Sequence, residues 1–234
     1  MIELQNVTKR YDSLTAVENV SFSVRTGESF ALLGPNGAGK TTIVKMLLDF
    51  TRPTSGSLSL NGIPSTHAEC RTSIGYLAEN HHIPSCLSGW RYLLRCAELS
   101  DMSRSDALEH CRRIVELIGM QGRESAKAGT YSKGMIQRFG LGAALMGEPK
   151  LLILDEPTSG LDPIGIREIR QLLESLKGQG MTIFLNSHLL SEVEKICDTA
   201  AIINRGKLLV KDAISAIVKD GETLEDVFVR LVKG

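Results

Sequence analysis

The sequence has no excess of charge of either sign. Its 234 residues contain 27 Lys and Arg and 27 Asp and Glu, so the formal net charge is zero. Affinity for nucleic acids depends on a basic surface that neutralises phosphates, and a neutral chain has no such surplus. The composition therefore gives no support to a DNA- or RNA-binding role, and we expect no nucleic acid among the partners.

Long hydrophobic runs are also absent. No apolar stretch approaches the roughly 20 residues that a membrane-spanning helix needs. The opening residues, MIELQNVTKRY, lack the apolar centre of a secretory signal peptide. We therefore expect a cytoplasmic protein. If it acts at a membrane, separate subunits must supply the membrane spans.

The cysteines show no pairing pattern, since the chain has five of them and none stand at C-x-x-C spacing. Reduced, mostly buried thiols are the expected state. There is no internal repeat, no low-complexity segment and no linker long enough to separate two domains. A hydrophobic content of 42% with 23% charged residues is typical of a globular protein. The length fits one domain, or one domain with a subdomain.

One glycine-rich stretch stands out. Residues 34–42 read GPNGAGKTT and fit the pattern G-x-x-x-x-G-K-[ST]. The apolar residues 29–33 before it can form a buried strand, and residues 43–48 after it can continue as a helix. This strand, loop and helix order favours a phosphate-binding loop over the alternative, a glycine-rich turn before an ordinary helix.

The chemistry of this stretch suits a triphosphate. Glycines let the backbone wrap closely so that several N–H groups point at the anion, and the following helix adds the positive end of its dipole. We expect the Lys40 ammonium on the β- and γ-phosphates and the Thr41 hydroxyl on Mg²⁺. The predicted nucleotide-binding residues of the loop are Gly34, Pro35, Asn36, Gly37, Ala38, Gly39, Lys40, Thr41 and Thr42.

Strand patterns surround the loop. Residues 1–11 alternate, with Ile2, Leu4 and Asn6 on one side, and residues 16–24 also show period two. Residues 1–24 therefore predict an antiparallel piece that leads into the phosphate-binding unit. Turn residues at 52–57 and Asn61-Gly62 bound a further short strand, and residues 74–78 form another.

The middle of the chain reads as a helical insertion at about residues 80–148, within a single domain of residues 1–234. After it, apolar strands alternate with amphipathic helices. The run Leu151–Leu154 suits a strand buried on both faces. We predict an α/β fold with a P-loop NTPase core, a mostly parallel sheet, an antiparallel β piece and a helical subdomain. The predicted later elements are strands at 151–154, 181–186, 200–204 and 207–210, and helices at 163–177, 189–197 and about 224–231.

A second motif follows the insertion, where residues 151–163 read LLILDEPTSGLDP. Asp155, at the end of the strand, can reach Mg²⁺ directly or through water. Glu156 follows and can act on water, and these are the two groups that phosphoanhydride hydrolysis requires. Without the phosphate loop upstream, the pair could equally be an exposed strand end.

These motifs, in this order, resemble the nucleotide-binding subunit of an ATP-binding cassette (ABC) transporter over essentially the whole chain. GPNGAGKTT resembles Walker A and LLILDE resembles Walker B. Residues 159–162 resemble the D-loop, and residues 186–188 resemble the switch loop with its histidine. Residues 131–135, YSKGM, resemble the family signature that separates this family from other P-loop proteins.

The resemblance implies a head-to-tail dimer with two ATP molecules between the Walker A of one subunit and the signature of the other. Ser132 and Gly134 then supply donors to the γ-phosphate across the interface. Each further role is also implied by a motif position. Glu156 is the general base, His188 contacts the γ-phosphate, Asp162 links the two sites, Tyr11 stacks on adenine, and Lys40 acts in catalysis.

The chain departs from the family pattern at several positions. The family usually has Gln after the strand at 74–78, where this chain has Glu79; a carboxylate can also ligate Mg²⁺. In the signature, Tyr131, Lys133 and Met135 replace Leu, Gly and Gln, a spelling that resembles exporter-type subunits. The adjacent His81 and His82 suit a solvated loop better than a metal site. Residues 90–94 are either local core or a groove for the membrane partner.

The sequence thus predicts an ATP hydrolase that binds ATP and Mg²⁺ and drives membrane permease subunits on separate chains, by resemblance an exporter. The metal ligands would be Thr41, Glu79 and Asp155. A second ATPase subunit would be another copy of the chain or a homologous subunit. The chain itself would be held at the inner face of the cell membrane through the permease. The rivals are a soluble ABC ATPase acting on ribosomes or DNA, and a module that holds ATP without hydrolysing it.

Overall fold

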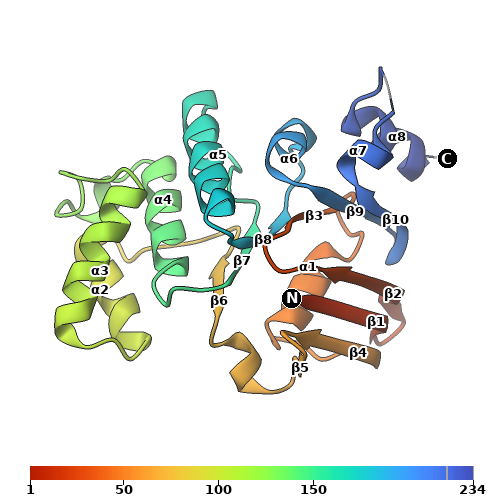
Figure 1. Cartoon of the computed structure of the whole chain (residues 1–234), viewed down its shortest axis with the longest axis horizontal. Helices are drawn as coiled ribbons and strands as arrows, with labels where there is room; N and C mark the ends of the chain where they lie inside the picture. Colours follow the sequence, from red (N-terminus) through yellow and green to blue (C-terminus); the bar gives the residue numbers. More distant parts are fainter. Residues whose placement is uncertain (220, 234) are drawn as a thin grey trace. The chain divides into compact units, whose positions relative to one another are not determined.

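The computed structural model describes residues 1–219 and 221–233, and contacts divide them into two units. The first unit combines residues 1–72 with the C-terminal part of the chain from Lys177 onward, and the second is Ser73–Leu176. Figure 1 labels the elements of both. The first unit is therefore formed by two separate stretches of the chain, and the second unit is the stretch between them in the sequence.

An antiparallel sheet opens the first unit, in the order β2-β1-β4-β5. Its strands are β1 (Ile2–Tyr11), β2 (Leu14–Val24), β4 (Ser55–Leu60) and β5 (Ile63–Pro64). Ile2 and Leu4 point into the core as the alternation predicts. The prediction that Asn6 continues this face was wrong: Asn6 is exposed and Val7 is buried instead. A bulge between Leu4 and Val7 shifts the register, and Asn6 takes a φ of 50° there.

A parallel sheet follows in the same unit. β3 (Ser29–Leu33) lies between β8 (Thr182–Asn186) and β9 (Thr199–Asn204), and it pairs with both in parallel. Every residue of β3 and β8 is buried, which explains their continuous apolar runs. β10 (Lys207–Ala213) pairs antiparallel with β9.

The helices of the first unit pack on its strands and on one another. α1 (Lys40–Leu47) starts directly after the glycine-rich loop and lies against β2 and β4 (Figure 1). The C-terminal helix α8 packs on α6 and α7 through the buried Leu224 and Val227. The bounds of these helices, and of one short 3-10 turn, are α6 (Leu190–Ile196), α7 (Ile214–Ile217), α8 (Leu224–Lys233) and η1 (Ala68–Arg71).

The second unit holds two parallel strands and the helical part of the chain. β6 (Ile74–Leu77) pairs with β7 (Leu151–Asp155), whose five residues are all buried. The helices α2, α3 and α4 contact one another, and α4 packs on β6 (Figure 1). Each of the three begins at a serine that caps it, namely Ser88, Ser103 and Ser132. The bounds are α2 (Gly89–Leu99), α3 (Arg104–Leu117), η2 (Ala128–Thr130), α4 (Lys133–Ala144) and α5 (Pro163–Gly178), which runs across the boundary at residue 176.

The described helices include none that is both long and apolar enough to span a membrane. Within α2, Leu93 is buried while Trp90, Tyr92 and Leu94 are half-buried. The prediction of a helical subdomain at about 80–148 in a single domain stays a prediction, although α2, α3 and α4 all fall inside that range.

Candidate nucleotide-binding site

The glycine-rich loop leaves the end of β3 and returns as α1. Its backbone is closed by a hydrogen bond from the Ala38 N–H to the Pro35 carbonyl at 3.1 Å. Gly39 is the N-cap of α1 with a φ of 107°, and no side chain caps the first turn. The N–H groups of that turn therefore stay available to an external acceptor, as an anion-binding helix start requires.

The Lys40 side chain is folded into the loop. Its ammonium donates to the Gly34 carbonyl at 2.6 Å and to the Pro35 carbonyl at 3.2 Å, and the residue is only 8% exposed. A buried ammonium is costly unless hydrogen bonds compensate it, and here the carbonyls of the loop contribute that compensation. The loop thus holds a positive charge at its centre.

An open pocket of about 470 Å³ lies over this loop within the first unit. All seven consecutive residues from Asn36 to Thr42 line this pocket, and so does Tyr11. Each of them is a predicted nucleotide contact. Leu14, Thr15, Ala16 and Arg205 complete the lining. The predicted residues Gly34 and Pro35 are not in the lining and serve as acceptors for Lys40 instead.

Tyr11 lies at the end of β1 and is 41% exposed. The Lys9 ammonium sits 4.8 Å from the centre of its ring, in a cation–π contact. This places a cation against the tyrosine ring at the rim of the pocket. No sequence pattern indicates Lys9, because a lysine near the end of a strand is ordinarily a solvated side chain.

Two glycines of the loop allow a matched prediction. An alanine Cβ at Gly39 would lie 2.4 Å from the Ala16 carbonyl oxygen, on a backbone with φ 107°; at Gly37, φ is 79° and no atom lies within 4 Å. Gly37→Ala should therefore cost only the left-handed strain, about 1 kcal/mol of unfolding free energy. Gly39→Ala should cost about 3 kcal/mol, because a backbone clash adds to the strain.

Urea unfolding of both variants, paired with nucleotide titrations, measures this difference. Equal losses in the two variants would contradict the close approach of Ala16 to the loop.

His188 belongs to the first unit as well, just after β8. Asn186 and Ser187 before it are buried, whereas His188 itself is exposed. The Leu189 N–H donates to the Ser187 hydroxyl at 3.1 Å, which shapes the turn. The local fold thus presents the imidazole outside the core, at the end of a buried strand.

The carboxylates predicted as metal ligands, Asp155 and Glu79, and the predicted general base, Glu156, lie in the second unit. Asp155 and Glu156, at the end of β7, are 5% and 8% exposed. β6 runs parallel to β7 with Leu77 opposite Leu154, so Glu79 follows at the same edge of this strand pair. Burial raises the pKa of Tyr76, and the nearby negative charges of Asp155 and Glu79 raise it further. In the described residues no three His, Cys, Asp or Glu side chains cluster as a metal site.

The signature departure at Tyr131 has a structural reason. The Tyr131 hydroxyl accepts from the Gly89 N–H at 3.1 Å and lies 2.8 Å from the Ala126 carbonyl, and its ring stacks on Phe139. Burial raises the pKa of this phenol. A tyrosine therefore fills the place of the usual leucine and adds hydrogen bonds that fix the start of α4.

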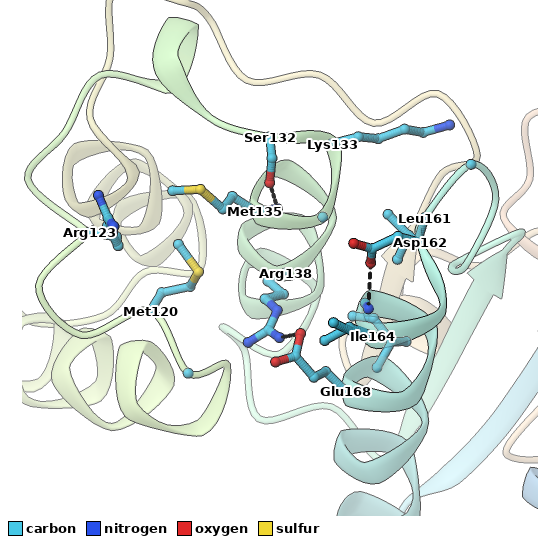
Figure 2. Close-up of a pocket in the computed structure, with 15 residues that line it drawn as sticks. Met120, Arg123, Ser132, Lys133, Met135, Arg138, Leu161, Asp162, Ile164 and Glu168 are labelled. Atoms are coloured by element: carbon cyan, nitrogen blue, oxygen red, sulfur yellow. Dashed lines mark hydrogen bonds and ion pairs between the residues drawn. The ribbon is translucent and has the colours of Figure 1, made fainter.

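A second pocket, of about 500 Å³, surrounds the start of α4 within the second unit. Figure 2 shows α4 between Met120 and Arg123 on one side and Leu161 and Asp162 on the other. Ser132 caps α4 by accepting from the Met135 N–H at 3.3 Å, and Asp162 accepts from the Gly165 N–H at 2.7 Å.

This second pocket brings together three predicted residues, Ser132, Gly134 and Asp162. Arg138 and Glu168 form an ion pair in its wall (Figure 2). Sequence patterns had not indicated Met120 or Arg123 as part of this site, because they lie in the turn after α3 and carry no motif.

The fold and the phosphate loop define the class of this protein as a P-loop nucleotide-binding protein. A comparison with family models matches the ABC transporter family over residues 17–159. The chain therefore belongs to the ABC transporter family.

Relatives agree with this assignment. The chain is 41% identical, over 90% of its length, to an uncharacterised ABC transporter ATP-binding protein of Nostoc sp., and it spans 63% of that relative. It is 37% identical to a lantibiotic transport ATP-binding protein of Streptococcus pyogenes, covering 97% of this chain and 96% of the relative. It is 40% identical to a bacitracin transport ATP-binding protein of Bacillus licheniformis, covering 89% and 68%.

Solved structures share the fold. An ATP-binding subunit of an ABC transporter superposes with a TM-score of 0.88 at 28% identity, covering 99% of both chains. A dimeric ATP-binding cassette in a post-hydrolysis state with ADP and Pi superposes with a TM-score of 0.82 at 22% identity, covering 91% and 98%. The predicted α/β P-loop fold and the predicted membership of the ABC transporter family are thereby confirmed.

Proposed function

We propose that this chain binds ATP with Mg²⁺, hydrolyses it in a head-to-tail dimer, and powers a membrane permease made of separate chains. The observation that carries the proposal is the pocket over the phosphate loop, with the buried Lys40 ammonium and the uncapped start of α1 at its base. A fixed cation and several N–H donors facing one open volume suit a polyphosphate.

Mg²⁺ would be held by oxygen ligands. Thr41 lies in the pocket lining, and Asp155 and Glu79 lie at one edge of the β6–β7 pair. Hydroxyl and carboxylate oxygens are what Mg²⁺ prefers, and the bound ion usually keeps phosphate oxygens and water as its other ligands. Its contribution is to neutralise charge that develops on the transferred phosphoryl group.

Hydrolysis needs a base for the attacking water and a donor to the γ-phosphate. Glu156 is the proposed base and His188 the proposed donor, while Lys40 stabilises charge on the phosphates. Tyr11, which lines the pocket and is 41% exposed, would take the adenine on its ring.

The dimer is proposed from the second pocket. Ser132 and Gly134, at the start of α4, would donate to the γ-phosphate bound by the partner copy, and Asp162 would link the two sites. The start of α4 lines an open pocket, as a site that receives its ligand from another chain requires. The dimeric cassette with the same fold supports this arrangement.

Export is proposed from the relatives, because lantibiotic and bacitracin transport are the named activities among them. The permease would carry the membrane spans and hold this chain at the inner face of the membrane. The second ATPase would be another copy of the chain or a homologous subunit. No observation favours the alternative of an ABC ATPase that acts on ribosomes or DNA.

Co-purification tests the proposal. Tagged Glu156→Gln protein is purified from native membranes in mild detergent with ATP and Mg²⁺, beside a tagged Lys40→Met control that should not retain nucleotide. We expect a multi-span membrane protein to co-purify. Ribosomal or DNA-bound proteins in its place would overturn the transport role and leave the nucleotide chemistry standing.

A further inference from the structure

The turn between β9 and β10 reaches the nucleotide pocket, although no motif marks it. Asn204 pairs with Lys207, so Arg205 and Gly206 form a two-residue hairpin turn. Their φ angles are 48° and 78°, which match a type I′ turn. Asn-Gly is the preferred spelling of such a turn, and an arginine at its first position is a disfavoured choice for the backbone.

Two hydrogen bonds fix this turn to the phosphate-binding region. The Gly206 N–H donates to the Ala38 carbonyl of the loop at 2.9 Å. The Glu18 N–H of β2 donates to the Gly206 carbonyl at 2.8 Å. The backbone of Arg205 is therefore held beside the loop, and this fixes the position from which its side chain extends.

The charge of Arg205 has no partner in the described part of the chain: no hydrogen bond or ion pair of its guanidinium occurs there. Lys207, the next basic residue of the hairpin, differs because its ammonium lies 3.6 Å from Glu18. Arg205 and Lys40 are the two basic residues in the lining of the pocket. An unpaired guanidinium, at a backbone position that disfavours arginine, indicates a role outside the fold itself.

We infer that Arg205 binds the phosphate chain of the nucleotide as a second cation beside Lys40. A guanidinium donates several N–H groups in a planar fork that matches phosphate oxygens. The link to Ala38 places the turn at the phosphate end of the pocket. The inference rests on the proposed nucleotide site and adds a contact to it that the loop motif does not contain.

Arg205→Asn provides the test, because asparagine suits a left-handed turn residue while it removes the charge. We expect the thermal midpoint to stay unchanged or rise and the Kd for ATP to increase by about three- to ten-fold, within the range of a single net hydrogen bond. Arg205→Lys, which keeps the charge but not the planar fork, should regain part of the affinity. Lys207→Ala is the matched control and should bind ATP as the wild type does.

Titrations at low and high ionic strength identify the contact. If Arg205 binds phosphates, the wild-type Kd should depend on salt more steeply than that of Arg205→Asn. An unchanged Kd in Arg205→Asn, an equal loss in Lys207→Ala, or equal salt dependence in both proteins would overturn the inference. If wild-type protein fails to bind ATP at all, the proposed function fails; if only Lys40→Met loses binding, this inference alone fails.

Discussion

Replacing Glu156 by Gln should lower ATP hydrolysis by about a thousand-fold, the middle of the range for loss of a general base. Glu156 is 8% exposed, and glutamine keeps its size and shape in that confined place. The amide cannot accept a proton from water, so the chemical step stalls while ATP stays bound. Phosphate release measured on the purified chain gives the turnover directly.

The same variant should accumulate as a dimer in the presence of ATP and Mg²⁺, since hydrolysis is what would separate the two copies. Light scattering after size exclusion measures the mass with and without nucleotide. Glu116→Gln, an exposed glutamate of α3 in the same unit, is the control and should behave as wild type. Unchanged turnover in Glu156→Gln, with only monomer present, would exclude Glu156 as the base.

The sequence predicted those elements in which the local residue pattern agrees with the environment in the folded chain. The run at β7 is apolar at four consecutive positions, and all five residues of the strand are buried because its two faces are covered. Ser103 stands before an amphipathic stretch and caps α3 through the Asp106 N–H. In both cases, the local pattern and the tertiary environment demand the same residues.

Features that depend on contacts between residues far apart in the chain could not be predicted from the sequence. The bulge at Asn6 forms because its N–H bonds to the Ser21 hydroxyl on the next strand, and no pattern within β1 indicates that partner. Arg205 reaches the pocket through a bond between its turn and Ala38, 168 residues distant from Gly206 along the chain (206 − 38). Pairings of this kind are set by the folded sheet and carry no local signature.

The signature loop shows a middle case. Its position in the motif order identified Ser132 and Gly134, and the structure places both at one open pocket. The reason for Tyr131 appears only in the fold, where its hydroxyl meets the Gly89 N–H from a different helix start. The departure at Tyr131 therefore changes how the start of the loop is held.

Lys40→Met should reduce ATP affinity by about a hundred-fold. Methionine keeps an unbranched side chain of similar length but removes the ammonium, which is 8% exposed and bonded to the Gly34 and Pro35 carbonyls. Losing a charge-assisted contact in a buried site costs about 3 kcal/mol, which corresponds to a factor of about a hundred in Kd. Calorimetric titration with ATP and Mg²⁺ measures it.

Lys45→Ala serves as the control, because Lys45 is an exposed lysine on the same helix and does not line the pocket. The double variant Lys40→Met with Glu156→Gln adds a stricter test. If Lys40 acts by holding the nucleotide, the double variant should stay monomeric with ATP, since the dimer requires bound ATP on both copies. A dimer that persists in the double variant, or ATP hydrolysis that survives Lys40→Met, would show that the phosphate loop does not bind ATP through this lysine.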